Sequence, residues 1–386
     1  MKAQNSFNDQ GDLIIMASIT PLPLSLTENL RQLGWSAFFA EQLDQDEIDA
    51  ITKEASPYFL ARVVRQNRDA WRIDNTVNYL NAKVLGYHHA EAALPIVGDW
   101  VMAKRVSDQQ AIIVKTFIRQ NQLGRSAPLK TGIVQSMVAN IDHLFILSSL
   151  NHDINLQRLE RYIILAQQDG IQPVIVLTKS DLIDDPLEIY LTIQTQLKSI
   201  DMAIISTLTD QGISSLYQYL KPGTTTAFLG SSGVGKTTLL NHLQQQQFET
   251  QSIRSGDDKG KHTTTYRELV KIDNQALVVD TPGMRELALS QSESALNAGF
   301  NDIDALAKQC RFRNCEHQNE PGCAVKAAIE STQLSSERWK NYLKLKREVK
   351  HFEQDADNHY QRQVQKQARK NMARRSRQRG SKWDRY

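Results

Sequence analysis

The 386-residue sequence contains no apolar run of the length that a membrane span requires. The stretch from Ile141 to Leu150 is too short and carries Asp142 and His143. Residues 1–11 are polar and lack the basic-then-apolar order of a signal peptide. We therefore expect a cytoplasmic protein without a membrane partner. Met16 opens a more ordinary start, so the residues before it are interpreted as a start-site artefact or a disordered lead.

Cysteine is also scarce, since the chain has 3 cysteines, all between Cys310 and Cys323. An odd number within one short window argues against a disulfide framework and favours a metal site. The pattern Cys310-x4-Cys315-x-His317-x5-Cys323 offers three thiolates and one imidazole, the ligand set of a closed structural Zn²⁺ site. We predict one structural zinc ion there; free buried thiols are the alternative.

The net charge is low, at +3, but it is distributed unevenly. Between Arg362 and Arg385 there are ten Lys or Arg residues against one acid, Asp384. A basic end on a nearly neutral body indicates a polyanionic partner. Because Trp383 and Tyr386 can stack on unpaired bases, we interpret this tail as an RNA contact. The alternative is a solvated helix end that aids solubility.

The pattern of apolar residues divides the chain into segments of different character. Residues 17–56 look helical. From Pro57 onward, short β-rich runs separated by turns are typical of a small barrel, for which an OB fold is favoured. These runs are Leu60–Arg65, Ala70–Ile73, Val101–Arg105 and Ala111–Ile118. Such barrels often bind oligonucleotides, and the alternative is a structural β-domain without a ligand.

From Ile141 onward, apolar strands alternate with helical patterns. This alternation predicts a parallel sheet with helices on both faces, which is an α/β fold. The strands are expected at 141–148, 174–177, 203–205, 225–229 and 277–279, and the helices at 155–168, 186–198 and 212–220. We expect a lead-in at 1–56, an OB-fold barrel at 57–135, an α/β P-loop domain at 136–295, an α-helical zinc-binding domain at 296–355 and a basic tail at 356–386.

Residues 230–237 match the phosphate-binding P-loop pattern G-x4-G-K-[ST]. The glycines let backbone N–H groups face phosphate oxygens, Lys236 reaches the β- and γ-phosphates, and Thr237 offers a hydroxyl to Mg²⁺. The loop stands between a strand and a helix, and the helix directs its positive end at the anion. The predicted phosphate site comprises Gly230, Ser231, Ser232, Gly233, Val234, Gly235, Lys236, Thr237 and Thr238.

The choice of base comes from Thr178-Lys179-Ser180-Asp181, directly after the strand 174–177. Asp181 can accept hydrogen bonds from N1–H and N2–H₂ of guanine, whereas adenine would leave a buried carboxylate unpaired. Lys179 can lie along the base. The tetrapeptide looks like the guanine-recognition motif N-K-x-D, with Thr178 in place of Asn. After the next strand, Ser206 fits a loop whose backbone N–H meets the guanine O6.

Two further elements complete a GTP-binding set. Asp280-Thr-Pro-Gly283 closes the strand 277–279, where Asp280 contacts Mg²⁺ through water and the Gly283 N–H contacts the γ-phosphate. The stretch Gly260–Thr265 stands in the position of the first switch. An ordinary GTPase places the base-recognition elements last, but here they come first, so the order is circularly permuted. The sheet can keep its strands because chain termini commonly lie close together.

Taken together, these residues resemble the RsgA (YjeQ) family of circularly permuted GTPases that act in small ribosomal subunit assembly. The resemblance covers about residues 57–350. Besides the nucleotide and cysteine motifs, it is carried by Gly98-Asp99-Trp100-Val101 and by Asn155-Leu156-Gln157-Arg158-Leu159-Glu160-Arg161-Tyr162. The departures are Lys261, where the family more often has Arg, and Met284, where Phe is commoner. The resemblance implies an OB fold, a permuted GTPase, a zinc domain, binding of the small subunit and its rRNA, contact with other assembly factors, and GTP hydrolysis stimulated by the subunit. We expect a monomer.

The catalytic group is not the usual one, since the stretch after the D-x-x-G motif, Met284-Arg285-Glu286-Leu287, contains no Gln to orient water. His262 in the first switch is the candidate for positioning the attacking water, and the family resemblance points the same way. The alternatives are a solvated loop histidine or an RNA contact. For the whole protein, the rival hypothesis is a non-hydrolysing, GTP-gated RNA-binding module, while Asp181 argues against a P-loop ATPase or nucleotide kinase.

Overall fold

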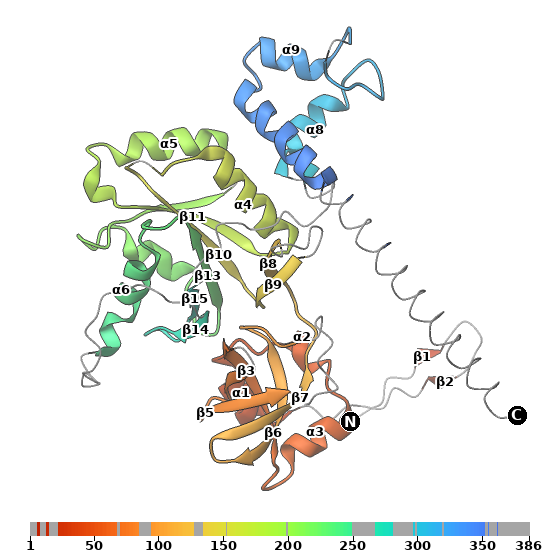
Figure 1. Cartoon of the computed structure of the whole chain (residues 1–386), viewed down its shortest axis with the longest axis vertical. Coiled ribbons are helices and arrows are strands. Elements are labelled where there is room, and N and C mark those ends of the chain that lie inside the picture. The colour runs from red at the N-terminus through yellow and green to blue at the C-terminus, as the bar shows by residue number, and fades with distance from the viewer. Residues whose placement is uncertain are drawn as a thin grey trace, which may run out of the picture.

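A computed structural model describes three bodies that follow one another along the chain (Figure 1). The described residues are 6–7, 13–14, 22–67, 70–84, 94–126, 134–151, 153–197, 200–248, 267–280, 296–297, 299–318, 320–351, 354 and 361. Within them, no helix is long and apolar enough to cross a membrane. Most of the predicted tail at 356–386 and the first switch lie outside these residues, as do residues 281–295. Strands β1 (Ser6–Phe7) and β2 (Leu13–Ile14) pair near the N-terminus.

The first body is a β-barrel covered by short helices. Its strands are β3 (Tyr58–Gln66), β4 (Trp71–Asp74), β5 (Tyr79–Val84), β6 (Trp100–Ser107) and β7 (Gln110–Thr116), and β3 also pairs with β6, which closes the barrel. The helices are α1 (Leu24–Arg31), α2 (Ala37–Ala40) and α3 (Gln45–Thr52). Trp35 lies edge-on to Trp100 at 4.8 Å and to Phe117 at 5.3 Å, so the residues before the barrel share its core. The OB-like barrel expected from the sequence is confirmed.

The second body is an α/β domain. Strands β10 (His143–Ser149), β11 (Gln172–Thr178), β12 (Asp201–Ile204), β13 (Thr225–Gly230) and β15 (Leu277–Asp280) run parallel in the order β12-β11-β10-β13-β15, and β14 (Glu268–Lys271) joins antiparallel at the edge. Strands β10 and β11 are buried almost throughout, as expected for a parallel sheet covered on both faces. Helices α4 (Leu156–Gln168), α5 (Pro186–Gln196) and α6 (Lys236–Phe248) pack around it.

The junction between the barrel and the α/β domain is built on a buried arginine. Arg62 of β3 donates hydrogen bonds to the carbonyl oxygens of Leu33, Gly98 and Asn140. Burial lowers the pKa of its guanidinium to about 10, which leaves it charged at neutral pH. Gly98 is required beside it, since a Cβ there would lie 2.1 Å from the carbonyl oxygen of Ala139. The hairpin β8 (Gln122–Ser126) and β9 (Val134–Ala139) leads from the barrel to β10.

The third body is helical and contacts α4 (Figure 1). It contains α8 (Asn301–Ala307), α9 (Ala324–Glu330) and a helix over residues 336–351. Glu160 of α4 accepts hydrogen bonds from Arg338 and Asn341, and Arg161 forms an ion pair of 2.8 Å with Glu348. These contacts fix the helical body on the α/β domain.

Candidate functional site

The predicted nucleotide motifs follow the carboxyl ends of neighbouring parallel strands. Strand β11 ends at Thr178, the first residue of the base-recognition tetrapeptide, and Ser206 comes shortly after β12. The P-loop begins at the last residue of β13, and Asp280 is the last residue of β15. Because the strands are parallel neighbours, these ends meet at one edge of the sheet, where ligands of open α/β sheets bind. Loops far apart in the sequence therefore form one candidate site.

The P-loop has the backbone conformation that its glycines permit. Gly233 and Gly235 have φ angles of 78° and 106°, which residues with a side chain rarely adopt. A Cβ on Gly230 would lie 2.5 Å from the carbonyl oxygen of Leu147 in β10. Lys236, at the start of α6, donates from Nζ to the carbonyl oxygens of Gly230 and Ser231, both at 2.7 Å. The side chain of Lys236 therefore lies back over the P-loop, with its Nζ against the first two residues of that loop.

The base-recognition loop is tied to the P-loop and to the loop after β12. The hydroxyl of Thr178 is buried and donates to the carbonyl oxygen of Val234 at 2.7 Å. Thr178, which replaces the usual Asn, thus joins the two loops. Asp181 accepts a hydrogen bond of 2.5 Å from the hydroxyl of Ser206, and that hydroxyl accepts from the backbone N–H groups of Leu208 and Thr209 at 3.2 Å.

This network orients one oxygen of Asp181 and leaves the residue itself exposed at the sheet edge. Lys179 has a φ of 60°, a left-handed conformation that turns the chain between β11 and the short helix η2 (Ser180–Leu182). Ser180 is buried beneath it. The arrangement can present a carboxylate to the two adjacent donors of a guanine ring.

The predicted γ-phosphate elements are described only in part. Asp280 pairs with Phe228 of β13 in the sheet, so its backbone stands beside the strand that enters the P-loop. Gly283 and His262 lie outside the described residues. Thr237 and Thr238 occupy the first turn of α6, at the end that faces the loop. The P-loop pattern predicts that Thr237 offers its hydroxyl to Mg²⁺, and the structure places this residue at that end of α6.

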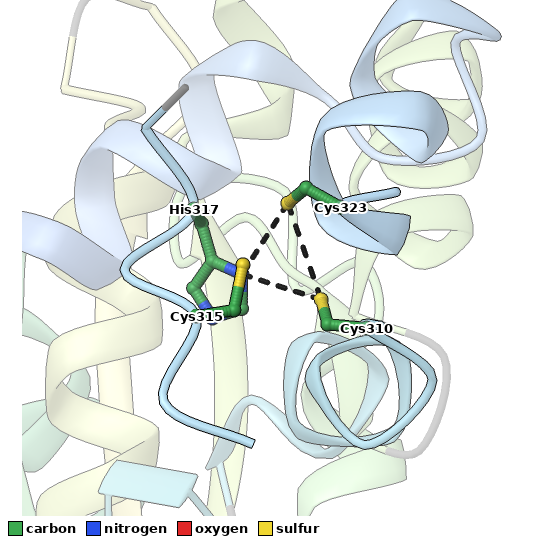
Figure 2. Close-up of side chains that lie close together, drawn as sticks. All are labelled: Cys310, Cys315, His317 and Cys323. Carbon is green, nitrogen blue, oxygen red and sulfur yellow. Dashed lines mark hydrogen bonds between the residues drawn. The ribbon is translucent and has the colours of Figure 1, made fainter. Parts of the chain in front are cut away.

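The cysteine motif folds into a compact cluster in the helical body (Figure 2). The ligand atoms of Cys310, Cys315, His317 and Cys323 all lie within 4.8 Å of one another. The Sγ atoms of Cys310 and Cys323 are 4.0 Å apart, and Nδ1 of His317 is 3.5 Å from each of them. Tetrahedral zinc with Zn–S bonds of about 2.3 Å separates its ligand atoms by roughly 3.8 Å. The donor set and its spacing therefore fit a metal ion of that kind.

Local structure holds these ligands in place. The Sγ of Cys323 caps α9 by accepting from the backbone N–H of Lys326 at 3.4 Å. His317 has a φ of 61° and packs edge-on against Trp339 of the last described helix, at 5.6 Å between ring centres. Burial lowers the pKa of the His317 imidazole, which favours the neutral ring that a metal ligand must be.

One pair of residues beside the P-loop was not assigned a role from sequence. The carboxylate of Asp153 accepts a hydrogen bond from Ser231 and forms an ion pair with Arg158. Arg158 belongs to the segment 155–162 that carries the family resemblance. A helix start at Asn155, just after the strand β10, is the signal in the sequence, but nothing there indicates a contact with residue 231.

Comparisons with known proteins agree with this geometry. The family model described as RsgA GTPase matches residues 116–290. A relative from Vibrio parahaemolyticus named small ribosomal subunit biogenesis GTPase RsgA 2 is 40% identical over 326 residues, covering 84% of this chain and 87% of the relative. One of the same name from Lactiplantibacillus plantarum is 44% identical over 304 residues, covering 78% and 85%.

Solved structures give the same result. The crystal structure of YjeQ from Thermotoga maritima has a TM-score of 0.58 and 25% identity, covering 76% of this chain and 98% of that chain. The crystal structure of YloQ, described as a circularly permuted GTPase, has a TM-score of 0.54 and 25% identity, covering 76% and 95%. The permuted order predicted from the motifs therefore agrees with the description of YloQ as a circularly permuted GTPase.

Proposed function

Since this chain belongs to the RsgA family of GTPases, we propose that it binds the small ribosomal subunit, acts in the late assembly of that subunit, and hydrolyses GTP faster when bound to it. The observation that carries the proposal is the sheet edge where the P-loop, Asp181 and Ser206 meet. This arrangement supports guanine nucleotide binding, and the names of the relatives supply the ribosomal partner.

Each part of the chain has a role in this proposal. The lead-in (1–56) supports the OB-fold barrel (57–135), which binds rRNA; the GTPase domain (136–295) binds GTP with Mg²⁺; the domain at 296–355 is held by zinc; and the tail (356–386) adds RNA contacts. The Cys310, Cys315, His317 and Cys323 cluster supports the zinc assignment, and Thr237 with Asp280 would hold Mg²⁺. We propose that the protein acts as a monomer in the cytoplasm.

The two switch elements explain why the partner should control hydrolysis. Asp280 is followed, in sequence, by the helical body, so the second switch stands at a domain junction. Residue Glu268 of β14, a few residues after the first switch, pairs with Arg65 of the barrel strand β3. A partner that binds the barrel thus acts on a segment adjoining the first switch. A partner that binds the helical body acts on a segment adjoining the second switch.

The test of the proposed function is GTP turnover by the purified protein with and without small ribosomal subunits. We expect slow turnover alone and an increase of about 100-fold or more with subunits, because a partner that completes a GTPase site can raise kcat by 10³–10⁵. Large subunits at the same concentration serve as the control. GTP binding without any turnover in the presence of small subunits would favour the rival, a GTP-gated RNA-binding module.

His262 is proposed to position the attacking water. We expect His262→Ala to lower subunit-stimulated kcat by about 100-fold, within the range that a positioned catalytic side chain contributes, with GDP affinity unchanged. His351→Ala, in the last described helix, is the matched control and should behave as wild type. Stimulated turnover that survives His262→Ala would show that another group serves this purpose.

A further inference from the structure

The carboxylate of Asp153 lies between the P-loop and the first turn of α4. One of its oxygens, Oδ2, accepts a hydrogen bond of 2.7 Å from the hydroxyl of Ser231, which is the first variable residue of the P-loop. The other, Oδ1, forms an ion pair of 2.8 Å with Arg158. Both oxygens of one carboxylate are therefore engaged, each by a different structural element.

The loop that carries Asp153 is itself fixed. The hydroxyl of Ser148 donates to the carbonyl oxygen of Asp153 at 3.1 Å, and Arg158 donates to the same oxygen. The backbone N–H of Asp153 donates to the carbonyl oxygen of Ser149 at 3.3 Å. Asn155 caps α4 by accepting from the N–H of Arg158 at 2.9 Å. The backbone of Asp153 is thus held from the end of β10 and from the start of α4, which places its carboxylate beside the P-loop.

Ser231 is the link between this carboxylate and the phosphate site. Its hydroxyl is held by Asp153, while its carbonyl oxygen accepts from Nζ of Lys236 at 2.7 Å. P-loops bind phosphate through backbone N–H groups and this lysine, so the orientation of the peptide at residue 231 affects both. A carboxylate near bound phosphates would repel them, and the ion pair with Arg158 offsets that repulsion.

We propose that Asp153 is a positioning residue for phosphate binding, which fixes Ser231 and thereby the P-loop in its binding conformation. The proposal rests on the proposed function, in which residues 230–238 bind the phosphates. Asp153 acts through Ser231 and does not contact the nucleotide. Arg158 orients the carboxylate through their ion pair, which gives a role to this residue of the segment 155–162.

The experiment is a double-mutant cycle on GDP affinity, measured by calorimetry on the full chain. We expect Asp153→Ala and Ser231→Ala each to weaken GDP binding about tenfold, which corresponds to about 1.4 kcal/mol. The double variant should bind no more weakly than the poorer single variant, because both changes remove the same hydrogen bond. Asp153→Asn keeps an oxygen acceptor for Ser231 and should restore most of the affinity.

Asp169→Asn is the matched control, since it removes a carboxylate at the opposite end of the same helix, and it should bind GDP as wild type does. If Asp153 only stabilised α4, its replacement would lower the melting temperature, and the losses of GDP affinity from the two single variants would add in the double variant. Additive losses, or Ser231→Ala binding GDP within twofold of wild type, would overturn the proposal. Failure of the wild-type chain to bind GDP would instead overturn the proposed function.

Discussion

Asp181→Asn is expected to weaken GTP binding by about 100-fold, or about 2.7 kcal/mol, and to make xanthosine triphosphate the preferred nucleotide. In the proposed site, the carboxylate of Asp181 would accept from the N1–H and N2–H₂ groups of guanine, whereas an amide offers one donor in place of one acceptor. Xanthine carries an oxygen at position 2, which suits that donor. The wild-type protein should reject ATP, because adenine would leave the carboxylate without its donors.

The structure adds a reason why this substitution should act on specificity and not on folding. Asp181 is exposed, and its described polar partner is the hydroxyl of the buried Ser206. An Asn side chain retains an oxygen that can accept from that hydroxyl, so the loop after β12 keeps its hydrogen bonds. The melting temperature of the variant without nucleotide should therefore stay close to that of the wild type.

Asp184→Asn provides the matched control, because it removes the same charge three residues later on an exposed position. Affinities for GTP, xanthosine triphosphate and ATP are measured by competition against a fluorescent guanine nucleotide. The control should keep the wild-type preference. Equal affinity of the wild type for ATP and GTP, or an unchanged preference in Asp181→Asn, would contradict the guanine assignment.

The permuted GTPase could be predicted from the sequence because each of its motifs is contiguous. The P-loop and the Thr178–Asp181 tetrapeptide each follow an apolar run, and their order alone reveals the permutation. Strands β10 and β11 are near-continuous apolar runs and were located to within a few residues. Short-range sequence patterns are therefore sufficient to predict the fold of this domain and of the OB-like barrel.

Elements that depend on distant partners could not be predicted in the same way. Strand β5 alternates between exposed and buried residues and has little apolar signal, and β14 is stabilised by pairing with β15 and β3. The helix expected at 212–220 is a 3₁₀ helix, η3 (Ile213–Gln218). Its hydrogen bonds, such as that from Ser215 N–H to Gly212 carbonyl, close after three residues because the segment is short.

The contacts between loops were equally hidden. In the sequence, Thr178 stands only as a replacement for the Asn of N-K-x-D, yet in the structure its hydroxyl bonds to the P-loop at Val234. Asp153 precedes a predicted helix and has no motif of its own, although it holds Ser231, 78 positions away. Such pairs depend on how parallel strands order themselves in the sheet, and a single sequence gives no information on that for polar side chains.

Cys315→Ser is expected to abolish zinc binding and to unfold much of the region between residues 300 and 350. In small sites the metal supplies folding free energy, with apparent values of about 10–16 kcal/mol for zinc-finger peptides. Helices α8 and α9 have seven residues each, too short to be stable alone. Cys310 lies just after the first, and Cys323 caps the second, so the ion would join both to the loop that carries His317.

Metal analysis should find about one zinc per chain in the reduced wild-type protein and close to none in Cys315→Ser, as expected for a site of four ligands. Limited proteolysis should cut the variant between residues 300 and 350. Asn314→Ser, which changes the exposed neighbouring residue, is the matched control and should keep both zinc and protease resistance. Wild-type protein without zinc, or a metal-free variant that resists protease as well as the control, would contradict a structural zinc site.

Cys315→Ser also distinguishes the contacts that α4 makes with the helical body from those that Asp153 and Arg158 make beside the P-loop. Unfolding of the helical body would remove the contacts of Glu160 with Arg338 and Asn341, but the contacts of Asp153 with Ser231 and Arg158 lie within the α/β domain. We therefore expect Cys315→Ser to keep GDP affinity within about twofold of wild type, a change of about 0.4 kcal/mol, while subunit-stimulated turnover is lost. A large loss of GDP affinity would mean that the helical body helps to hold the P-loop through α4, whose Arg158 pairs with Asp153 and whose Glu160 contacts Arg338.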